Sequence, residues 1–141
     1  MSTKRFAWLA TFAVALVLVV PAVASAPRAG MLQISKECSQ YDGTAGSFCT
    51  ITSSNLDAIP AGSKVVYTNA PDVAAGKLDT DLVVYTRGAN AAAGHVVLDL
   101  ATGTGTVTLS GGTGQFKKFT ATVAVAPTGG PNFSWVGSYS Y

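Results

Sequence analysis

The sequence predicts an all-β protein, an eight-stranded antiparallel β-barrel. Residues 25–141 contain eight short runs rich in β-branched and aromatic residues. Clusters of glycine, proline, asparagine and aspartate separate these runs, and no part of the region repeats apolar residues at helical spacing. Eight strands in so short a chain favour a closed meander, because closure removes the exposed edges of a sheet.

The first segment resembles a secretory signal peptide. Lys4 and Arg5 precede an apolar run over residues 6–20, and Ala22-Val23-Ala24 offers a small-x-small cleavage site before Ser25. An uncleaved membrane anchor is the alternative, but this run is shorter than the roughly 20 residues that cross a bilayer. We therefore predict a signal peptide over residues 1–24, a single barrel domain over residues 25–141 and a secreted or periplasmic location.

The charge of the predicted mature chain is balanced. Two of the nine basic residues, Lys4 and Arg5, lie in the signal segment, so seven basic residues face seven acidic ones. A net charge near zero gives no reason to expect nucleic acid as a partner, or a membrane surface once the signal is removed.

Two cysteines, Cys38 and Cys49, are predicted to form a structural disulfide, since an exported chain meets an oxidising environment. A zinc site is disfavoured because two cysteines and one distant histidine match no ligand spacing. A redox pair is disfavoured because the spacing is not Cys-x-x-Cys. We therefore predict no metal and no cofactor.

Each predicted strand is delimited by turn residues. The strands cover residues 31–36, 47–53, 63–69, 80–87, 94–101, 104–110, 116–126 and 132–141. The separating segments are, in order, 37–46 with Asp42-Gly43, 55–60 as a possible helical turn, 70–77 with Pro71 and Gly76, the loop at Asn90, Thr102-Gly103, the glycines of 111–114, and 127–131.

The last five strands predict a common apolar face. A two-residue turn at Thr102-Gly103 would pair Leu98 with Val107 and Val96 with Leu109, so that apolar residues meet. Even-numbered registers add the neighbouring strands to this face, and a slip by one residue would break it. The predicted interior consists of Val96, Leu98, Leu100, Val107, Leu109, Val123 and Trp135.

The opposite face carries His95, the only histidine, together with Arg87 and Asp99. An imidazole beside an arginine and a carboxylate can act as a general acid or base. The favoured interpretation is that these residues belong to the solvated outer face of the barrel.

Two segments of the chain resemble the allene oxide cyclase-like barrel family, which includes the dirigent proteins. Residues 104–116 read TGTVTLSGGTGQF and lead into an extended strand, and the ending FSWVGSYS at 133–140 resembles bacterial secreted members. The resemblance covers roughly residues 63–141. It implies an eight-stranded barrel with an apolar cavity, assembly into dimers or trimers, and guidance of small-molecule cyclisation or coupling. The family's catalytic residues have no matching position here, and Glu37, the only glutamate, lies outside the resembling region.

Two functions follow from this reasoning. In the preferred hypothesis, the barrel binds a small hydrophobic or aromatic molecule and can guide a cofactor-free cyclisation or isomerisation, with Tyr67, Trp135 and Tyr139 at the ligand. Each of these side chains combines an apolar body with a hydrogen-bonding tip, although core packing explains each one as well. In the alternative, the protein is a non-catalytic structural or interaction module whose barrel is filled by its own side chains.

Overall fold

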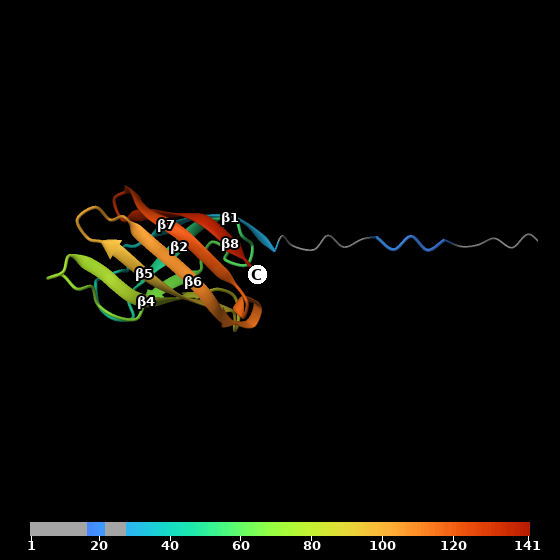
Figure 1. Cartoon of the computed structure of the whole chain (residues 1–141), viewed down its shortest axis with the longest axis horizontal. Coiled ribbons are helices and arrows are strands. Elements are labelled where there is room, and N and C mark those ends of the chain that lie inside the picture. Colours follow the sequence, from blue (N-terminus) through green and yellow to red (C-terminus); the bar gives the residue numbers. More distant parts are fainter. Residues whose placement is uncertain (1–16, 22–27) are drawn as a thin grey trace, which may run out of the picture.

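The computed structural model describes residues 17–21 and 28–141, and it contains a closed barrel of eight antiparallel strands (Figure 1). The strands are β1 (Ala29–Glu37), β2 (Phe48–Ser54), β3 (Lys64–Tyr67), β4 (Lys77–Tyr85), β5 (Ala91–Asp99), β6 (Gly105–Thr113), β7 (Thr120–Gly129) and β8 (Asn132–Ser140). A short 3-10 helix, η1 (Gly114–Phe116), separates β6 from β7. The predicted fold class and the eight strands are confirmed, with strand ends that differ by a few residues.

The barrel is closed by its first and last strands. β1 pairs with β8 along its whole length, from Ala29 opposite Ser140 to Glu37 opposite Asn132. Figure 1 shows the start of β1 beside the C-terminal end of the chain. Every other strand pairs with its neighbours in sequence, so the architecture is the predicted meander.

Inward-facing residues form one continuous core, which confirms most of the predicted interior. Val96, Val107, Leu109, Val123 and Trp135 are all buried. The even registers are also confirmed, since Val107 lies opposite Val123 and Leu109 opposite Ala121. The remaining large buried side chains include Leu32, Ile34, Ile51, Val65, Leu82 and Val84.

The turn between β5 and β6 differs from the prediction. Val96 pairs with Val107 rather than Leu109, and the loop spans the five residues 100–104 instead of two. This shift by two residues keeps every side chain on its predicted face, because the side-chain period of a strand is two. It also takes Leu100 out of the ladder, so Leu100 is 40 % exposed and Leu98 is half-buried. The prediction that Leu100 lines the interior is therefore wrong.

The glycine-rich segment after Ser110 continues β6 instead of turning at once. Gly112 pairs with Ala92 of β5, and a Cβ atom there would lie 2.0 Å from the Ala91 carbonyl oxygen. Glycine is needed at this position because the backbones of β5 and β6 approach closely. The chain then turns through η1. Phe116 was predicted to begin a strand, but it is the last residue of η1, and its side chain is buried.

One end of the barrel is plugged and the other is not. Three fully buried side chains from the connections at the plugged end, Ile59, Phe116 and Phe119, fill it. The opposite end is formed by the loops after β1, β3, β5 and β7. The site described below lies at that second end, which we call the open end.

The predicted signal peptide, residues 1–24, and the cleavage site before Ser25 lie outside the described residues except for 17–21. Residues 17–21 form no strand or helix. Among the residues that the structure describes, no helix has the length and apolar character needed to span a membrane.

Candidate functional site at the open end of the barrel

A disulfide between Cys38 and Cys49 is present at the open end, as predicted. Cys38 follows directly after β1, and Cys49 lies in β2. The bond therefore ties the loop over residues 38–47 to the barrel wall. A disulfide of this kind indicates an oxidising, extracellular-type environment.

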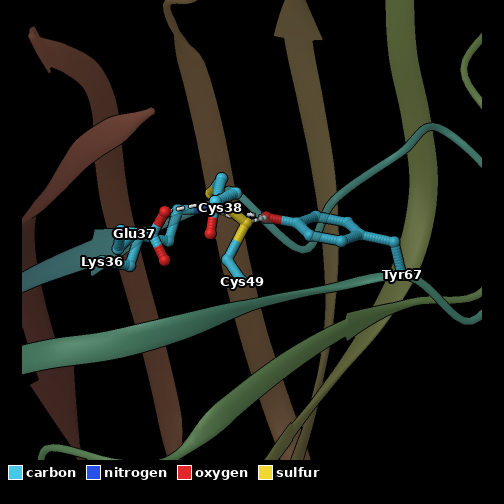
Figure 2. Close-up of a disulfide and its surroundings, with 6 residues drawn as sticks. Lys36, Glu37, Cys38, Cys49 and Tyr67 are labelled. Carbon is cyan, nitrogen blue, oxygen red and sulfur yellow. Dashed lines mark hydrogen bonds between the residues drawn. A yellow bond between two sulfur atoms is a disulfide. The ribbon is translucent and has the colours of Figure 1, made fainter. Parts of the chain in front are cut away.

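Lys36 is the feature that distinguishes this end of the barrel. Along β1 the inward positions are Leu32, Ile34 and Lys36, so the lysine continues an apolar row into the interior and is only 4 % exposed. Its Nζ atom hydrogen-bonds to the Tyr67 hydroxyl and lies 3.9 Å from the Cys49 Sγ atom. Figure 2 shows the Tyr67 hydroxyl directed at the disulfide, and Tyr67 comes from β3, the strand next to the one that carries Cys49.

Aromatic rings surround the Lys36 amine where a carboxylate would be expected. The Nζ atom lies 4.9 Å from the ring centroid of Trp135, 5.2 Å from that of Tyr67 and 5.6 Å from that of Phe133. Such rings stabilise a cation through their quadrupoles. Within residues 28–141, no carboxylate forms an ion pair with this lysine.

Burial controls the protonation of Lys36 and Tyr67. Desolvation lowers the pKa of Lys36 to about 7, because the ammonium form loses its hydration in the interior. Desolvation likewise raises the pKa of the Tyr67 hydroxyl, with a smaller contribution from Tyr41. Near neutral pH the site therefore holds a protonated phenol and an amine that is divided between its neutral and charged forms.

A cavity of about 180 Å³ opens beside this amine. Its strand-borne walls are Lys36, Cys49, Tyr67, Leu78, Leu98 and Phe133. The loops add Cys38, Tyr41, Leu100 and Gly103 at the mouth. Apolar surface therefore dominates the walls, and the polar groups are few and convergent, which is the usual composition of a small-molecule site.

Two buried polar atoms near the cavity have no hydrogen-bond partner among the described residues. They are the Tyr41 hydroxyl and the Trp135 Nε1 group. Tyr41 packs edge-on against Tyr67 with 5.0 Å between ring centroids. Buried donors are nearly always paired in proteins. The unpaired Tyr41 hydroxyl at the cavity wall is thus available to a ligand atom that accepts a hydrogen bond.

The three predicted ligand residues do not lie together: two are near Lys36 and the third is near the opposite end of the barrel. Tyr67 lines the cavity, and Trp135 lies under Lys36 in the core. Tyr139 lies near the plugged end, where it stacks on Phe119 and borders a wider surface groove of about 530 Å³ with Tyr141. The structure therefore brings Tyr67 and Trp135 to one place and separates Tyr139 from them.

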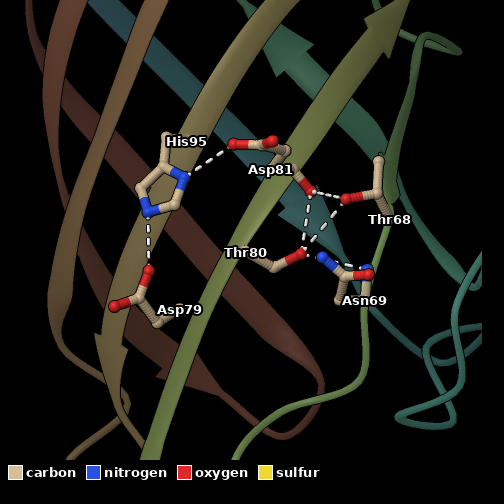
Figure 3. A network of polar contacts seen from close by, with 6 residues as sticks. All are labelled: Thr68, Asn69, Asp79, Thr80, Asp81 and His95. Atoms are coloured by element: carbon tan, nitrogen blue, oxygen red, sulfur yellow. Dashed lines mark hydrogen bonds and ion pairs between the residues drawn. The ribbon is translucent and has the colours of Figure 1, made fainter.

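His95 lies on the exposed outer face, and its partners are not Arg87 and Asp99. Its Nδ1 atom lies 2.7 Å from Asp81 Oδ1, and its Nε2 atom lies 2.6 Å from Asp79 Oδ1 (Figure 3). Both hydrogen bonds raise the pKa of His95, and the one to Asp81 makes the larger contribution. The three side chains link β4 to β5 on the surface.

Thr80 lies beside this cluster but belongs to a second set of contacts. Its hydroxyl accepts a hydrogen bond from the Asn69 amide at 3.0 Å and lies 3.3 Å from the Thr68 hydroxyl. Figure 3 shows these contacts on the side of Asp81 away from His95. Thr80 is buried, so the contacts fasten the chain after β3 to β4.

Sequence reasoning did not identify Lys36 as a functional residue. The sequence does contain a pattern that indicates its burial. Lys36 lies two positions after Ile34 and four after Leu32, so it falls on the inward face of the same strand. A lysine in that position is rare, because lysine is almost never fully buried without a partner. The alternation of the first strand was the pattern that could have revealed it.

No described group of three or more histidine, cysteine, aspartate or glutamate side chains is placed to hold a metal ion. Comparison of the chain with protein-family models, curated proteins and solved structures found no match. The resemblance to the allene oxide cyclase-like family accordingly stays a prediction from the sequence.

Proposed function

We propose that this protein binds a small hydrophobic or aromatic molecule in the cavity at the open end of the barrel. The observation that carries the proposal is an apolar cavity whose inner wall includes the buried Lys36 amine and the Tyr67 hydroxyl. A cavity serving only as a packing gap would be expected to lack polar groups, since burying an ionisable side chain costs free energy.

The volume of the cavity limits the size of the ligand. An apolar cavity of about 150 Å³ is large enough to bind benzene, whereas drug-sized ligands occupy about 300–1,000 Å³. At about 180 Å³, the cavity fits one six-membered ring with a small substituent, or the end of a longer molecule.

The polar groups of the cavity define the ligand's functional group. Lys36 and Tyr67 lie at the inner wall, and the Tyr41 hydroxyl has no partner among the described side chains. All three can donate a hydrogen bond. A ligand with an oxygen acceptor on its inner end, such as a carbonyl or hydroxyl group, would satisfy them.

Binding is the core of the proposal, and the cofactor-free cyclisation or isomerisation implied by the family resemblance is a narrower version of it. A substrate that folds on itself must fit inside the cavity in its compact form, and the volume admits a ring-sized product. We also propose that the chain is exported to the periplasm or secreted, which agrees with the disulfide and with the signal-like segment.

Calorimetric titration with benzyl alcohol, benzaldehyde and benzoate tests the proposal. Tryptophan fluorescence gives a second readout, because Trp135 is the only tryptophan of residues 25–141, the predicted mature chain. We expect saturable binding of at least one probe with one site per chain. If none binds and Trp135 emission does not change, the protein has a filled barrel and the structural alternative holds.

A matched pair of variants locates the site. Tyr67→Phe removes a hydroxyl from the cavity, whereas Tyr139→Phe removes one near the plugged end. We expect Tyr67→Phe to weaken probe binding about fivefold to tenfold, the value of one hydrogen bond, and Tyr139→Phe to leave it unchanged. If Tyr139→Phe weakens probe binding and Tyr67→Phe does not, the probe binds in the groove beside Tyr141 instead of in the cavity.

A further inference from the structure

We propose that Lys36 forms a reversible imine with a small apolar or aromatic aldehyde that enters the open-end cavity. This inference rests on the proposed function, since the aldehyde must first bind there. It assigns to the protein a covalent capture of carbonyl compounds, with Lys36 as the nucleophile and Tyr67 as the group that moves protons.

The first step of the argument is position. Lys36 lines the cavity, and its Nζ atom contacts three other lining residues, Tyr67, Cys49 and Phe133. A carbonyl carbon held in the cavity can therefore approach the amine although the lysine as a whole is buried. The carbonyl oxygen of such a molecule would lie near the Tyr67 hydroxyl, which is hydrogen-bonded to the same nitrogen. The attacking atom and the proton donor are therefore on one side of the bound molecule.

The second step is reactivity. Only the neutral amine attacks a carbonyl, and lysines desolvated in apolar pockets are the ones that form imines in proteins. The ionisable side chains that line the cavity together with Lys36 are Tyr41 and Tyr67, and neither is anionic at neutral pH because burial raises the pKa of both. No carboxylate of the described residues holds the amine as an ammonium ion.

The reaction balances without any further reactant. The nitrogen lone pair forms a C–N bond to the carbonyl carbon, and the carbonyl π pair moves to oxygen, which takes a proton from Tyr67. The nitrogen then returns a proton to Tyr67, which leaves a neutral carbinolamine. Tyr67 then protonates the carbinolamine hydroxyl, which leaves as water while the nitrogen lone pair forms the C=N bond, and the resulting iminium nitrogen returns its proton to the Tyr67 phenolate. One aldehyde and one amine thus give one imine and one water, with no oxidation or reduction.

The other lysines of residues 28–141 provide an internal comparison. Lys64, Lys77, Lys117 and Lys118 are exposed at the surface, and none of them lines this cavity. An unperturbed lysine side chain, with a pKa of about 10.4, is neutral at pH 7 in only about one molecule in 2,500. For Lys36, with a pKa of about 7, the neutral fraction is about one half. Lys36 should therefore react first at low aldehyde concentration.

Reductive trapping on the full-length, disulfide-bonded protein tests the inference. The protein is incubated at pH 7 with benzaldehyde and sodium cyanoborohydride, which reduces imines and leaves disulfides intact, and the benzylated lysines are mapped by mass spectrometry. We expect Lys36 to be benzylated at least about tenfold faster than Lys64, because Lys36 lines the cavity that holds benzaldehyde and Lys64 does not. Benzyl alcohol in excess should suppress labelling of Lys36 and leave Lys64 unaffected.

Three controls make the result specific. Lys36→Met should lose the selective adduct while retaining the barrel's far-ultraviolet circular dichroism, and Tyr67→Phe should slow labelling of Lys36 more than it weakens benzyl alcohol binding. Anthracene-9-carbaldehyde, whose three fused rings exceed the cavity, should show no preference for Lys36.

The outcomes separate this inference from the proposed function. If benzyl alcohol binds but Lys36 is labelled no faster than Lys64, imine formation is wrong and the binding function stands. If benzoate binds tightly and no adduct forms, Lys36 acts as an ammonium partner for carboxylates and the inference is overturned. If no probe binds and no selective adduct forms, both proposals fail.

Discussion

At the scale of single residues, the protein is defined by an amine placed where a strand would normally carry a leucine or valine. Lys36 follows Leu32 and Ile34 on the inward side of β1 and has three aromatic rings around its Nζ atom. Its position is unfavourable for folding at any pH at which the amine is protonated. A side chain that costs stability and lines a cavity is a typical sign of function.

This cost makes stability depend on pH. The pKa of Lys36 is about 7 in the folded protein, below the ordinary value of about 10.4 in the unfolded chain. Between these values the unfolded state binds the extra proton, so the free energy of unfolding rises with pH by up to about 1.4 kcal/mol per pH unit. Below pH 7 both states are protonated and the full penalty applies.

The measurement is chemical denaturation of the wild type and of Lys36→Met at pH 7, 8 and 9, with the disulfide intact. The difference between the two proteins isolates the lysine, because every other titratable group is present in both. We expect the wild type to gain stability relative to Lys36→Met across this range. Parallel pH profiles would show that the amine is solvated in the folded barrel.

The contribution of His95, on the outer surface, to stability depends on pH in the opposite direction to that of Lys36. Hydrogen bonds to Asp81 and Asp79 raise its pKa above 6.5, so its stabilising effect is present below pH 6.5 and is lost as pH rises through the folded pKa. The effect on stability is small, a few tenths of a kcal/mol, because the cluster is solvated. As the only histidine, its ring gives a single set of NMR signals to titrate.

The NMR titration should give a pKa above 6.5 for the wild type. Asp81→Asn should lower that pKa more than Asp79→Asn does, because the hydrogen bond to Asp81 makes the larger contribution. Equal titration curves for all three proteins would mean that the two carboxylates do not hold the ring in solution.

At the scale of elements, the alternation of apolar and polar residues predicts which face of each strand is inside the barrel. It does not predict the lengths of the turns. A register shift by one residue exposes the core, whereas a shift by two moves apolar residues onto other apolar residues. The sequence therefore predicted the burial of Val107 and Leu109 correctly and their partners on β5 incorrectly. Leu100 was misplaced for the same reason, because its burial depended on the length of the turn.

Leu109 and Leu100 test this distinction directly. Both were predicted to be interior, but Leu109 is fully buried and Leu100 lies at the cavity mouth. Leu109→Ala should lower the free energy of unfolding by about 2–5 kcal/mol, as for other buried leucines. Leu100→Ala should change it by less than about 1 kcal/mol while altering probe binding. Denaturation curves of the two variants decide the matter, and equal losses would favour the two-residue turn.

The cavity itself could not be predicted from the pattern of residues. Strand count, face and disulfide follow from local spacing, but an empty volume depends on how side chains from six strands and two loops fill the same space. Tyr67 and Tyr139 look equivalent in sequence, as inward tyrosines near strand ends. They differ only because the barrel has one plugged end and one open end, which the three-dimensional closure decides.

At the scale of the whole molecule, the disulfide is the one covalent link between the wall and a loop at the open end. It closes a segment with a sequence separation of 11 residues. Its removal by the double substitution Cys38→Ser and Cys49→Ser should cost about 3 kcal/mol in the chain-entropy account. Because both cysteines line the cavity, probe affinity should fall as well.

Thermal and chemical unfolding of the double variant, together with probe titration, measure both effects. Lys36→Met serves as the comparison that changes the cavity and keeps the covalent link. A double variant with wild-type stability would mean that the loop over residues 38–47 is held by its remaining contacts alone.

The pairing of β1 with β8 also sets the order of events while the chain is being made. β1 can pair with β2 almost at once, but its other edge needs a strand that begins at Asn132, about a hundred residues later. At roughly 5–20 residues per second, a ribosome needs roughly 5–20 s to synthesise that interval. Throughout this time β1 presents an unpaired edge that a second nascent copy can occupy. Faster translation of the segment between the two strands should therefore raise the yield of monomer.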